Sequence, residues 1–268
     1  MKKQNHKRNG AAIGSAAIAP FKSIFEKAAY HGSYDKTFDD FLIMCICALT
    51  RNPETGLSYY EDEYMSIIEP YKANETLKYF PELLAELILY MEENKDSNDG
   101  NDLLGMFFEQ ELSHGRNGQF FTPFHVCQMM AQITKGEEIK SVNVLDPSCG
   151  SGRMLMAFAK GSKFIHGYYG IDIDYRCVKI TAINLFLNGM RGEVICADAL
   201  AGNDFRCGYR ISIFPLGIFK IENKEASSIW QSQQKEKTVP KEIKVTLPSE
   251  EKTTSHEKPS SASQLQLF

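Results

Sequence analysis

The segment Val144-Leu145-Asp146-Pro147-Ser148-Cys149-Gly150-Ser151-Gly152-Arg153-Met154-Leu155 decides the fold. An apolar run ends at an acidic residue, a turn with glycine at two alternate positions follows, and a helical pattern begins. Glycine lets a ligand approach the backbone closely, and the first turn of a helix presents unpaired N–H groups. Asp146 can also hold an ammonium group, which a pyrophosphate-binding turn would not require. A Gly-x-Gly turn alone fits any strand-to-helix connection, but in this context we expect a ligand site.

Short β-rich runs surround this segment and alternate with helical patterns. The runs are Val142 to Leu145, Phe164 to Ile171, Val194 to Cys196, and Ile211 to Phe214. Helical patterns lie between the first three. This alternation predicts an α/β fold with a doubly wound parallel sheet.

Two further predicted strands end in acidic residues. Asp172 follows the second strand, where a carboxylate is placed to accept hydrogen bonds from ribose hydroxyls. Asp174 is the second choice for this role and is otherwise expected to cap the next helix. Asp198 follows the third strand and could bind an adenine amino group.

The chain before Gly118 has a helical period and predicts an all-α bundle. We expect one helix to begin at Pro20 and another near Thr37 and Asp40, which are candidate capping residues. A third should begin at Pro81, and a fourth should cover residues 103–108. Residues 92–102 are polar and predict a loop. The expected organisation is a basic flexible arm at 1–19, a helical domain at 20–117, a cofactor-binding domain at 118–221 and a disordered tail at 222–268.

The composition of the 268 residues is that of an ordinary soluble globular protein, with 43% hydrophobic and 24% charged residues and a net charge of −4. The overall charge gives no indication of nucleic-acid binding, and no apolar run is long enough to span a membrane. The seven cysteines are scattered without a CxxC pair, which argues against a zinc site or a disulfide framework. The start resembles a secretory signal only in outline, because its apolar run is mostly alanine. We expect the protein to be located in a reducing cytoplasm.

Asp146-Pro147-Ser148-Cys149-Gly150-Ser151-Gly152 resembles the S-adenosylmethionine loop of the N6-adenine DNA methyltransferases, most closely that of type I modification subunits. Gly118-Gln119-Phe120-Phe121-Thr122-Pro123 is similar to the family's Gly-x-Phe-Tyr-Thr-Pro element, in the same order along the chain. The segment 102–109 resembles the family's connection between helical domain and sheet. The resemblance covers roughly residues 35 to 200.

The resemblance implies a Rossmann-like methyltransferase sheet, S-adenosylmethionine as cofactor and double-stranded DNA as a partner. It implies that Phe120 and Thr122 touch the methionine end of the cofactor and that Thr122 also caps a helix begun by Pro123. Asp146 and Gly150 would flank the sulfonium, Asp172 the ribose and Asp198 the adenine. The implied cofactor-binding residues are Phe120, Thr122, Asp146, Pro147, Ser148, Gly150, Gly152, Asp172, Ile173, Asp198 and Ala199.

The family's catalytic Asn-Pro-Pro-Tyr/Phe element has no counterpart in this sequence. No two of the ten prolines are adjacent, and the expected place after the fourth strand holds Ile211-Ser212-Ile213-Phe214-Pro215-Leu216. Ser212 is better explained as a strand residue. The family also continues through further strands and a target-recognition region. We therefore expect a truncated or degenerate methylase that is inactive alone, with a sheet that a partner chain completes.

The last five residues, Gln264-Leu265-Gln266-Leu267-Phe268, resemble the peptide by which bacterial replication and repair proteins bind the sliding clamp. An ordinary chain end explains them equally well. They support an alternative function, a non-catalytic interaction protein that uses Gln264, Leu265, Leu267 and Phe268 to associate with replicating DNA. A small-molecule methyltransferase is a weaker alternative, because the helical region and the Thr-Pro element favour the DNA family.

Overall fold

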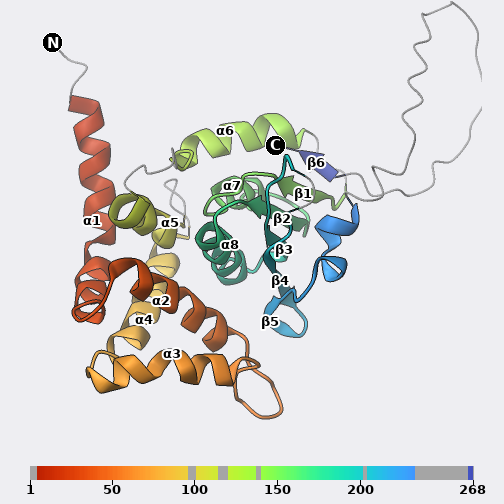
Figure 1. Ribbon diagram of the computed structural model, residues 1–268. Coiled ribbons are helices and arrows are strands. Elements are labelled where there is room, and N and C mark those ends of the chain that lie inside the picture. Colours follow the sequence, from red (N-terminus) through yellow and green to blue (C-terminus); the bar gives the residue numbers. More distant parts are fainter. Residues whose placement is uncertain are drawn as a thin grey trace, which may run out of the picture.

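A computed structural model of the chain describes residues 5–95, 101–113, 120–136, 140–201, 204–232 and 265–267 (Figure 1). The first part is helical, as predicted. Its helices are α1 (Asn5–Ala28), α2 (Tyr34–Leu49), α3 (Glu61–Ala73), α4 (Tyr79–Asn94) and α5 (Leu103–Phe107), and α5 continues into the π-helical turn η1 (Phe108–Ser113). None of the helices in the described ranges is long and apolar enough to cross a membrane.

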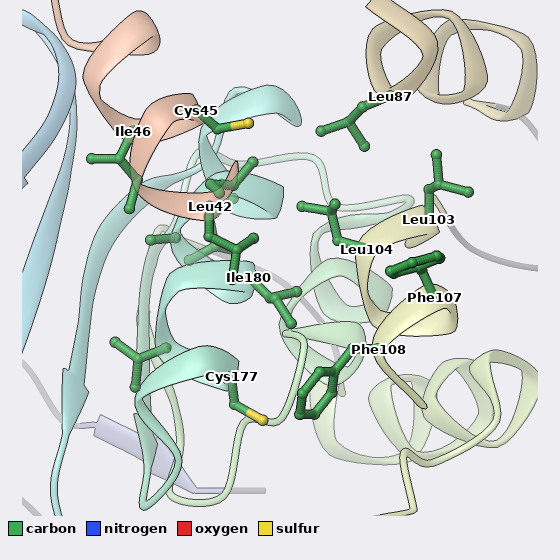
Figure 2. Close-up of a cluster of buried hydrophobic side chains, with 14 of the residues drawn as sticks. Leu42, Cys45, Ile46, Leu87, Leu103, Leu104, Phe107, Phe108, Cys177 and Ile180 are labelled. Atoms are coloured by element: carbon green, nitrogen blue, oxygen red, sulfur yellow. The ribbon is translucent and has the colours of Figure 1, made fainter. Parts of the chain in front are cut away.

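Aromatic side chains hold the helical region together. The ring centroid of Phe107 lies 5.0 Å from that of Phe21 and 4.8 Å from that of Phe25, both in edge-to-face geometry. The core does not stop at the end of this region. Leu42 of α2 and Leu104 of α5 point toward Ile180 of α8 (Tyr175–Leu187), so one core joins the bundle to the sheet region (Figure 2).

The helices differ from the prediction at several points; α4, for example, begins at Tyr79 rather than at Pro81. Helix α1 begins at Asn5 and contains Pro20, so the segment predicted as a flexible arm is helical from that residue; its alanine-rich sequence has high helix propensity. Helix α2 begins after Ser33, and Asp40 lies inside it, buried and bound to the hydroxyl of Tyr71 at 2.6 Å. Helix α3 was not predicted, because its apolar residues form no long stripe.

Five strands of the sheet come from residues 143–220. They are β1 (Asn143–Asp146), β2 (Gly167–Asp172), β3 (Arg191–Cys196), β4 (Cys207–Ile213) and β5 (Leu216–Lys220). With β6 (Leu265–Leu267) the described order is β5-β4-β3-β2-β1-β6. Helices α6 (Phe124–Lys135) and α7 (Arg153–Ala159) precede and follow β1, and α8 connects β2 to β3.

Strands β1, β2 and β3 are parallel, which confirms the doubly wound prediction for this part of the sheet. The fourth strand differs from the expectation. It returns antiparallel along β3 and pairs with β5 in a hairpin. A parallel crossover needs a dozen or more residues with a helix, and residues 197–206 are too few for one.

The predicted tail is folded up to residue 232. Residues 228–232 are helical, Trp230 is buried, and Ile229 packs with Ile221 in a second buried cluster that includes strand residues Ile171 and Ile195. The buried carboxylate of Glu193 on β3 accepts hydrogen bonds from the backbone N–H groups of Ser228 and Ile229, at 3.1 and 3.2 Å. These N–H groups belong to the first turn of the short helix, so Glu193 caps it. The sequence around residue 228 cannot reveal this, because the capping residue lies far away along the chain.

Candidate cofactor site

A cavity of about 480 Å³ opens at the carboxyl ends of β1 and β2. This size lies within the range of small-molecule sites, and such sites occur at this edge of open α/β sheets. The residues that line it are Phe120, Phe121, Thr122, Cys127, Met130, Asp146, Ser148, Cys149, Gly150, Ser151, Arg153, Met154, Asp172, Ile173 and Cys177.

Two carboxylates at the ends of adjacent strands face this cavity. Asp146 accepts a hydrogen bond from the N–H of Ser148 at 3.0 Å. Asp172 accepts one from the N–H of Gly150 at 2.8 Å and one from the N–H of Asp174 at 2.9 Å. Burial raises the pKa of both carboxyl groups, and the backbone N–H donors partly offset that effect. The pair forms an anionic floor suited to cationic and hydroxyl groups.

The two glycines of the loop have positive φ, at 54° for Gly150 and 86° for Gly152. A Cβ at Gly150 would lie 2.9 Å from the ring of Phe121, and one at Gly152 would lie 3.0 Å from the methyl group of Thr181. A side chain at either position is therefore both strained and crowded. The glycine spacing reflects close packing of the loop against Phe121 and against α8.

The segment before α6 also lines the cavity. Phe120 is 75% exposed at the cavity, and Thr122 lines it. The predicted cap is wrong: α6 begins at Phe124 with Pro123 as the N-cap, and the carbonyl oxygen of Thr122 accepts a hydrogen bond from the thiol of Cys127 at 3.5 Å.

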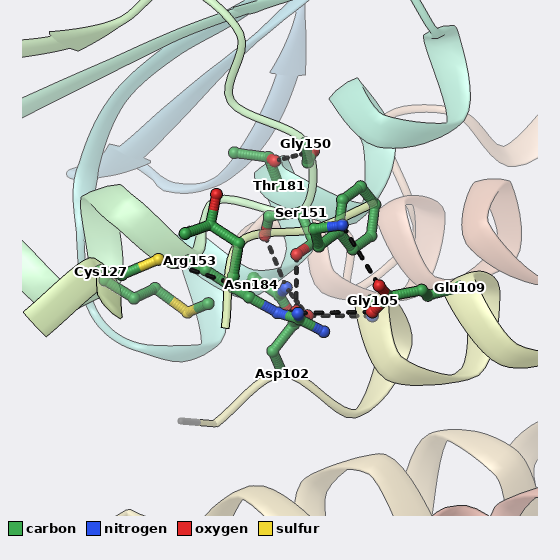
Figure 3. A network of polar contacts seen from close by, with 12 residues as sticks. Asp102, Gly105, Glu109, Cys127, Gly150, Ser151, Arg153, Thr181 and Asn184 are labelled. Carbon is green, nitrogen blue, oxygen red and sulfur yellow. Dashed lines mark hydrogen bonds and ion pairs between the residues drawn. The ribbon is translucent and has the colours of Figure 1, made fainter. Parts of the chain in front are cut away.

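Beneath the loop, a buried aspartate joins three parts of the chain (Figure 3). Asp102 is 2% exposed and accepts a hydrogen bond from the N–H of Gly105 at 2.9 Å, which caps α5. It also accepts from Ser151 Oγ and Arg153 Nε, both at 2.6 Å, and from Asn184 Nδ2 of α8 at 2.8 Å. The helical region, the loop and α8 are therefore fixed to one another by one carboxylate.

Three further contacts extend this network toward the cavity. Glu109, in η1, accepts a hydrogen bond from the N–H of Phe121 at 3.2 Å and lies 3.4 Å from Arg153 Nη1. Thr181 of α8 donates to the carbonyl oxygen of Gly150 at 2.8 Å. The loop conformation thus depends on residues outside the loop, and the sequence alone did not identify them.

The structure brings together some of the predicted residues and not others. Phe120, Thr122, Asp146, Ser148, Gly150, Asp172 and Ile173 line the cavity, whereas Pro147, Gly152, Asp198 and Ala199 are not among its lining residues. The Oδ1 atom of Asp198 accepts hydrogen bonds from the N–H groups of Leu200 and Ala201, at 2.8 and 3.2 Å. Asp174 caps α8 through the N–H of Arg176, as expected for the second choice.

The segment expected at the catalytic position lies elsewhere. Ser212 is a strand residue of β4, and Phe214 at the tip of the β4–β5 hairpin is 97% exposed. The hairpin is fastened to the helical region: Thr50 Oγ1 and the N–H and carbonyl groups of Ile218 form two hydrogen bonds, at 3.0 and 3.1 Å. This segment occupies the far side of β3 from β1 and does not line the cavity.

Leu265 and Leu267 of the clamp-like peptide belong to β6, which pairs with β1. Gln264 and Phe268 lie outside the described residues. In the ranges that the structure describes, no group of three or more His, Cys, Asp or Glu side chains could hold a metal ion. All seven cysteines are free.

Curated relatives are found among restriction-modification proteins. The methylase subunit of the type I restriction enzyme MpnII of Mycoplasma pneumoniae is 26% identical over 175 residues, which cover 59% of this chain and 32% of that protein. The type II restriction enzyme and methyltransferase RM.BcgI of Heyndrickxia coagulans is 30% identical over 130 residues, 42% of this chain and 20% of that one. This chain thus spans about a third or less of the length of these relatives.

A solved structure with similarity to this chain is a type I restriction-modification methyltransferase subunit from Streptococcus thermophilus. The match has 19% identity and a TM-score of 0.30, and it covers 63% of this chain and 37% of that one. The sequence model described as N-6 DNA Methylase matches residues 100–248. This range includes the loop, both cavity carboxylates and the buried Asp102, and it is more than half of the 268 residues. The chain belongs to the N-6 DNA methylase family.

Proposed function

We propose that this chain binds S-adenosylmethionine and forms the cofactor-binding half of a DNA adenine-N6 methyltransferase. The observation that carries this proposal is the cavity with Asp146 and Asp172 on its floor beside the glycine loop. These two acceptors fit the cofactor, since a buried carboxylate at each strand end can accept hydrogen bonds from ammonium or hydroxyl groups. Membership of the N-6 DNA methylase family supports the same cofactor.

The residues have distinct tasks in this proposal. Asp172 binds the ribose hydroxyls, Asp146 and Gly150 lie beside the sulfonium, and Phe120 and Thr122 contact the methionine end. When bound, the cofactor supplies the methyl group. The chain's own contribution is to orient that group and to exclude water around it, because in-line transfer depends mainly on positioning.

The groups that bind the adenine come from outside residues 1–268 in this proposal. Two observations support this: residues 1–268 include no two adjacent prolines, and the β4–β5 hairpin lies on the far side of β3. The duplex DNA and a specificity or catalytic partner subunit are therefore proposed partners. A reducing cytoplasm is the proposed location, in keeping with seven free cysteines.

Calorimetric titration with S-adenosylmethionine tests the cofactor proposal. We expect binding by the wild-type chain and a loss of about 1–3 kcal/mol for Asp172→Ala, the range for a charge-assisted hydrogen bond. Glu69→Ala is the matched control, because it removes an exposed carboxylate that pairs with Lys72 of α3, a helix that does not line the cavity. Equal affinity of Asp172→Ala and wild type would show that the ribose does not bind at Asp172.

The second candidate function is the interaction protein with a clamp-binding tail. The sequence Gln264–Phe268 favours it, and clamp binding would require Leu265–Leu267 to leave β1. Pull-down of purified bacterial sliding clamp by the intact chain, with the chain lacking Gln264–Phe268 as control, tests it. No retention of the clamp by the intact chain would eliminate this candidate.

A further inference from the structure

Two of the seven cysteines lie opposite each other in the sheet. Cys196 is the last residue of β3, Cys207 is the first residue of β4, and the two are direct partners in the antiparallel register of these strands. Opposed residues in antiparallel strands have Cα atoms about 4.5–5.5 Å apart and side chains on the same face. A disulfide needs a Cα separation of about 4.4–6.8 Å. The register therefore suits a disulfide without a shift of either strand.

The two thiols have different environments. Cys196 is 1% exposed, and its proton has two acceptors, the sulfur of Cys207 and the carbonyl oxygen of Ile173 at 3.5 Å. The hydrogen bond to Cys207, together with burial, raises the pKa of Cys196. Cys207 is only half-buried, and the same hydrogen bond lowers its pKa more than burial raises it. The negative charge of the ionised pair therefore lies on the more accessible sulfur, that of Cys207.

Two cationic side chains stabilise this charge. Lys179 of α8 is 8% exposed; within the described ranges it forms no hydrogen bond or ion pair, and its Nζ lies 4.8 Å from the centre of the Tyr175 ring. A buried ammonium group needs compensating anions, and the ionised sulfur of Cys207 acts on it together with nearby carboxylates. The exposed Arg206 places Nη1 3.9 Å from Cys196 Sγ. Both cations lower the pKa of Cys207 and so favour the thiolate, which is the nucleophilic form.

The other five cysteines lack this combination of access and charge. All five are buried, and burial raises the pKa of each: Cys45, Cys47, Cys127, Cys149 and Cys177. Cys207 alone among the seven is both partly accessible and easily ionised. Its partner for a disulfide is already in place on the neighbouring strand.

We propose that Cys196 and Cys207 form a reversible oxidation site, at which a peroxide converts the two thiols into a disulfide. Cys207 is the attacking thiol and Cys196 the resolving thiol. The inference goes beyond the proposed function and does not depend on it, because neither residue lines the cofactor cavity.

The reaction takes place in two steps. The thiolate sulfur of Cys207 attacks one oxygen of hydrogen peroxide, the O–O bond breaks, and Cys207 becomes a sulfenic acid while the departing hydroxide takes up a proton to form water. The sulfur of Cys196 then attacks the sulfur of Cys207, the S–O bond breaks, and the departing hydroxide leaves as water with the proton of Cys196. The two thiols lose two electrons in total, and one peroxide is reduced to two water molecules. A dithiol reductant reverses the change.

Peptide mapping of the peroxide-treated full chain tests the site. Trypsin cleaves after Arg191, Arg206 and Arg210, so the two cysteines fall in separate peptides that only a disulfide keeps together. The folded chain is treated with hydrogen peroxide at pH 7, its remaining thiols are alkylated in denaturant, and the digest is analysed by mass spectrometry. We expect the two peptides to appear as one linked species, with the loss of two hydrogen atoms, and to separate after dithiothreitol treatment. No linked species, or pairing of these cysteines with the other five as often as with each other, would overturn the proposal.

Single variants test the order of the two steps. Cys196→Ser removes the resolving thiol, so dimedone should trap the sulfenic acid at Cys207. Cys207→Ser leaves only the buried thiol of Cys196, where we expect about tenfold less dimedone adduct, because a protonated thiol is a poor nucleophile. Equal labelling of the two variants would contradict the assignment of Cys207 as the attacking thiol.

Cys45→Ala is the matched control, because Cys45 lies buried in α2 and takes no part in the β3–β4 register. Peroxide treatment of this variant should give the same linked peptides as wild type. Loss of the linked peptides would contradict a site made of Cys196 and Cys207 alone.

Discussion

The cofactor loop and the β4–β5 hairpin are both fastened to the helical region, but by different interactions. The loop is held by the buried carboxylate of Asp102. This carboxylate accepts hydrogen bonds from Arg153 and from three further donors. The hairpin is held by the hydroxyl of Thr50, which binds a backbone N–H and a backbone carbonyl of Ile218. Only the first attachment reaches residues that line the cavity. The helical region therefore has two roles, of which one positions the site and the other closes the far edge of the sheet.

The largest expected effect is that of Asp102→Ala. It leaves the buried guanidinium of Arg153 without its main partner, and breaking a buried ion pair in this way costs about 3–5 kcal/mol of unfolding free energy. Urea denaturation measures this loss. Asp204→Asn, at an exposed pair, is the control and should leave the midpoint nearly unchanged. A loss below about 1 kcal/mol for Asp102→Ala would show that the network does not hold the loop.

Thr50→Val should have a smaller effect, of a different kind. It leaves the N–H and carbonyl groups of Ile218 unpaired in a buried place, at a cost of about 1–3 kcal/mol in unfolding free energy. Cofactor affinity should not change. If calorimetry instead gave a weaker affinity in the folded variant, the hairpin and the loop would be coupled, and the contrast between the two attachments would fail.

The pH dependence of cofactor binding tests the loop region without a mutation. Burial raises the pKa values of Asp146 and Asp172, so both carboxylates take up protons at a higher pH than an ordinary aspartate. Binding of a cationic ligand needs the ionised form. Affinity should therefore be full at neutral pH and fall as the pH decreases through the raised pKa values, by about tenfold per unit for each group below its pKa.

The sign for stability is opposite to that for binding. A carboxyl group with a raised pKa holds its proton in the folded state at pH values where the unfolded chain has lost it. Unfolding free energy from these two groups therefore rises as the pH falls through that window. Thermal melts of wild type and Asp172→Ala between pH 4 and 7 test this sign, because the variant should gain less stability on acidification.

The smallest expected effect is that of Asp198→Ala on cofactor affinity. The carboxylate of Asp198 binds the N–H groups of its own turn and does not line the cavity. Its loss should weaken cofactor binding less than Asp172→Ala does. An equal or larger effect would restore the adenine-binding role that the family resemblance implies for this residue.

The sequence predicted the parts of the fold that depend on local patterns. The apolar runs of β1 to β3 and the turn at Gly150 were found because each is complete within a few residues. The direction of β4, the strand β5 and the folding of residues 221–232 depend on distant partners. Glu193, for example, caps a helix that begins at Ser228. No local pattern could reveal that contact.

The same distinction applies to the candidate site. Asp146 and Asp172 were predicted because carboxylates at parallel strand ends share one edge of the sheet. Asp102 was read only as part of a connecting segment, although it accepts donors from Ser151 and Asn184, which lie far along the chain. The spacing of Asp102, Gly105 and Glu109 within one helical start is the signal that could have identified it.

A crystal structure of the chain with S-adenosylmethionine tests the central claim most directly. The account predicts the cofactor in the cavity at the ends of β1 and β2, with the ribose hydroxyls within hydrogen-bond distance of Asp172 and the sulfonium beside Asp146 and Gly150. A cofactor bound at another place, or a cavity that stays empty at saturating concentration with the loop held as described, would contradict it.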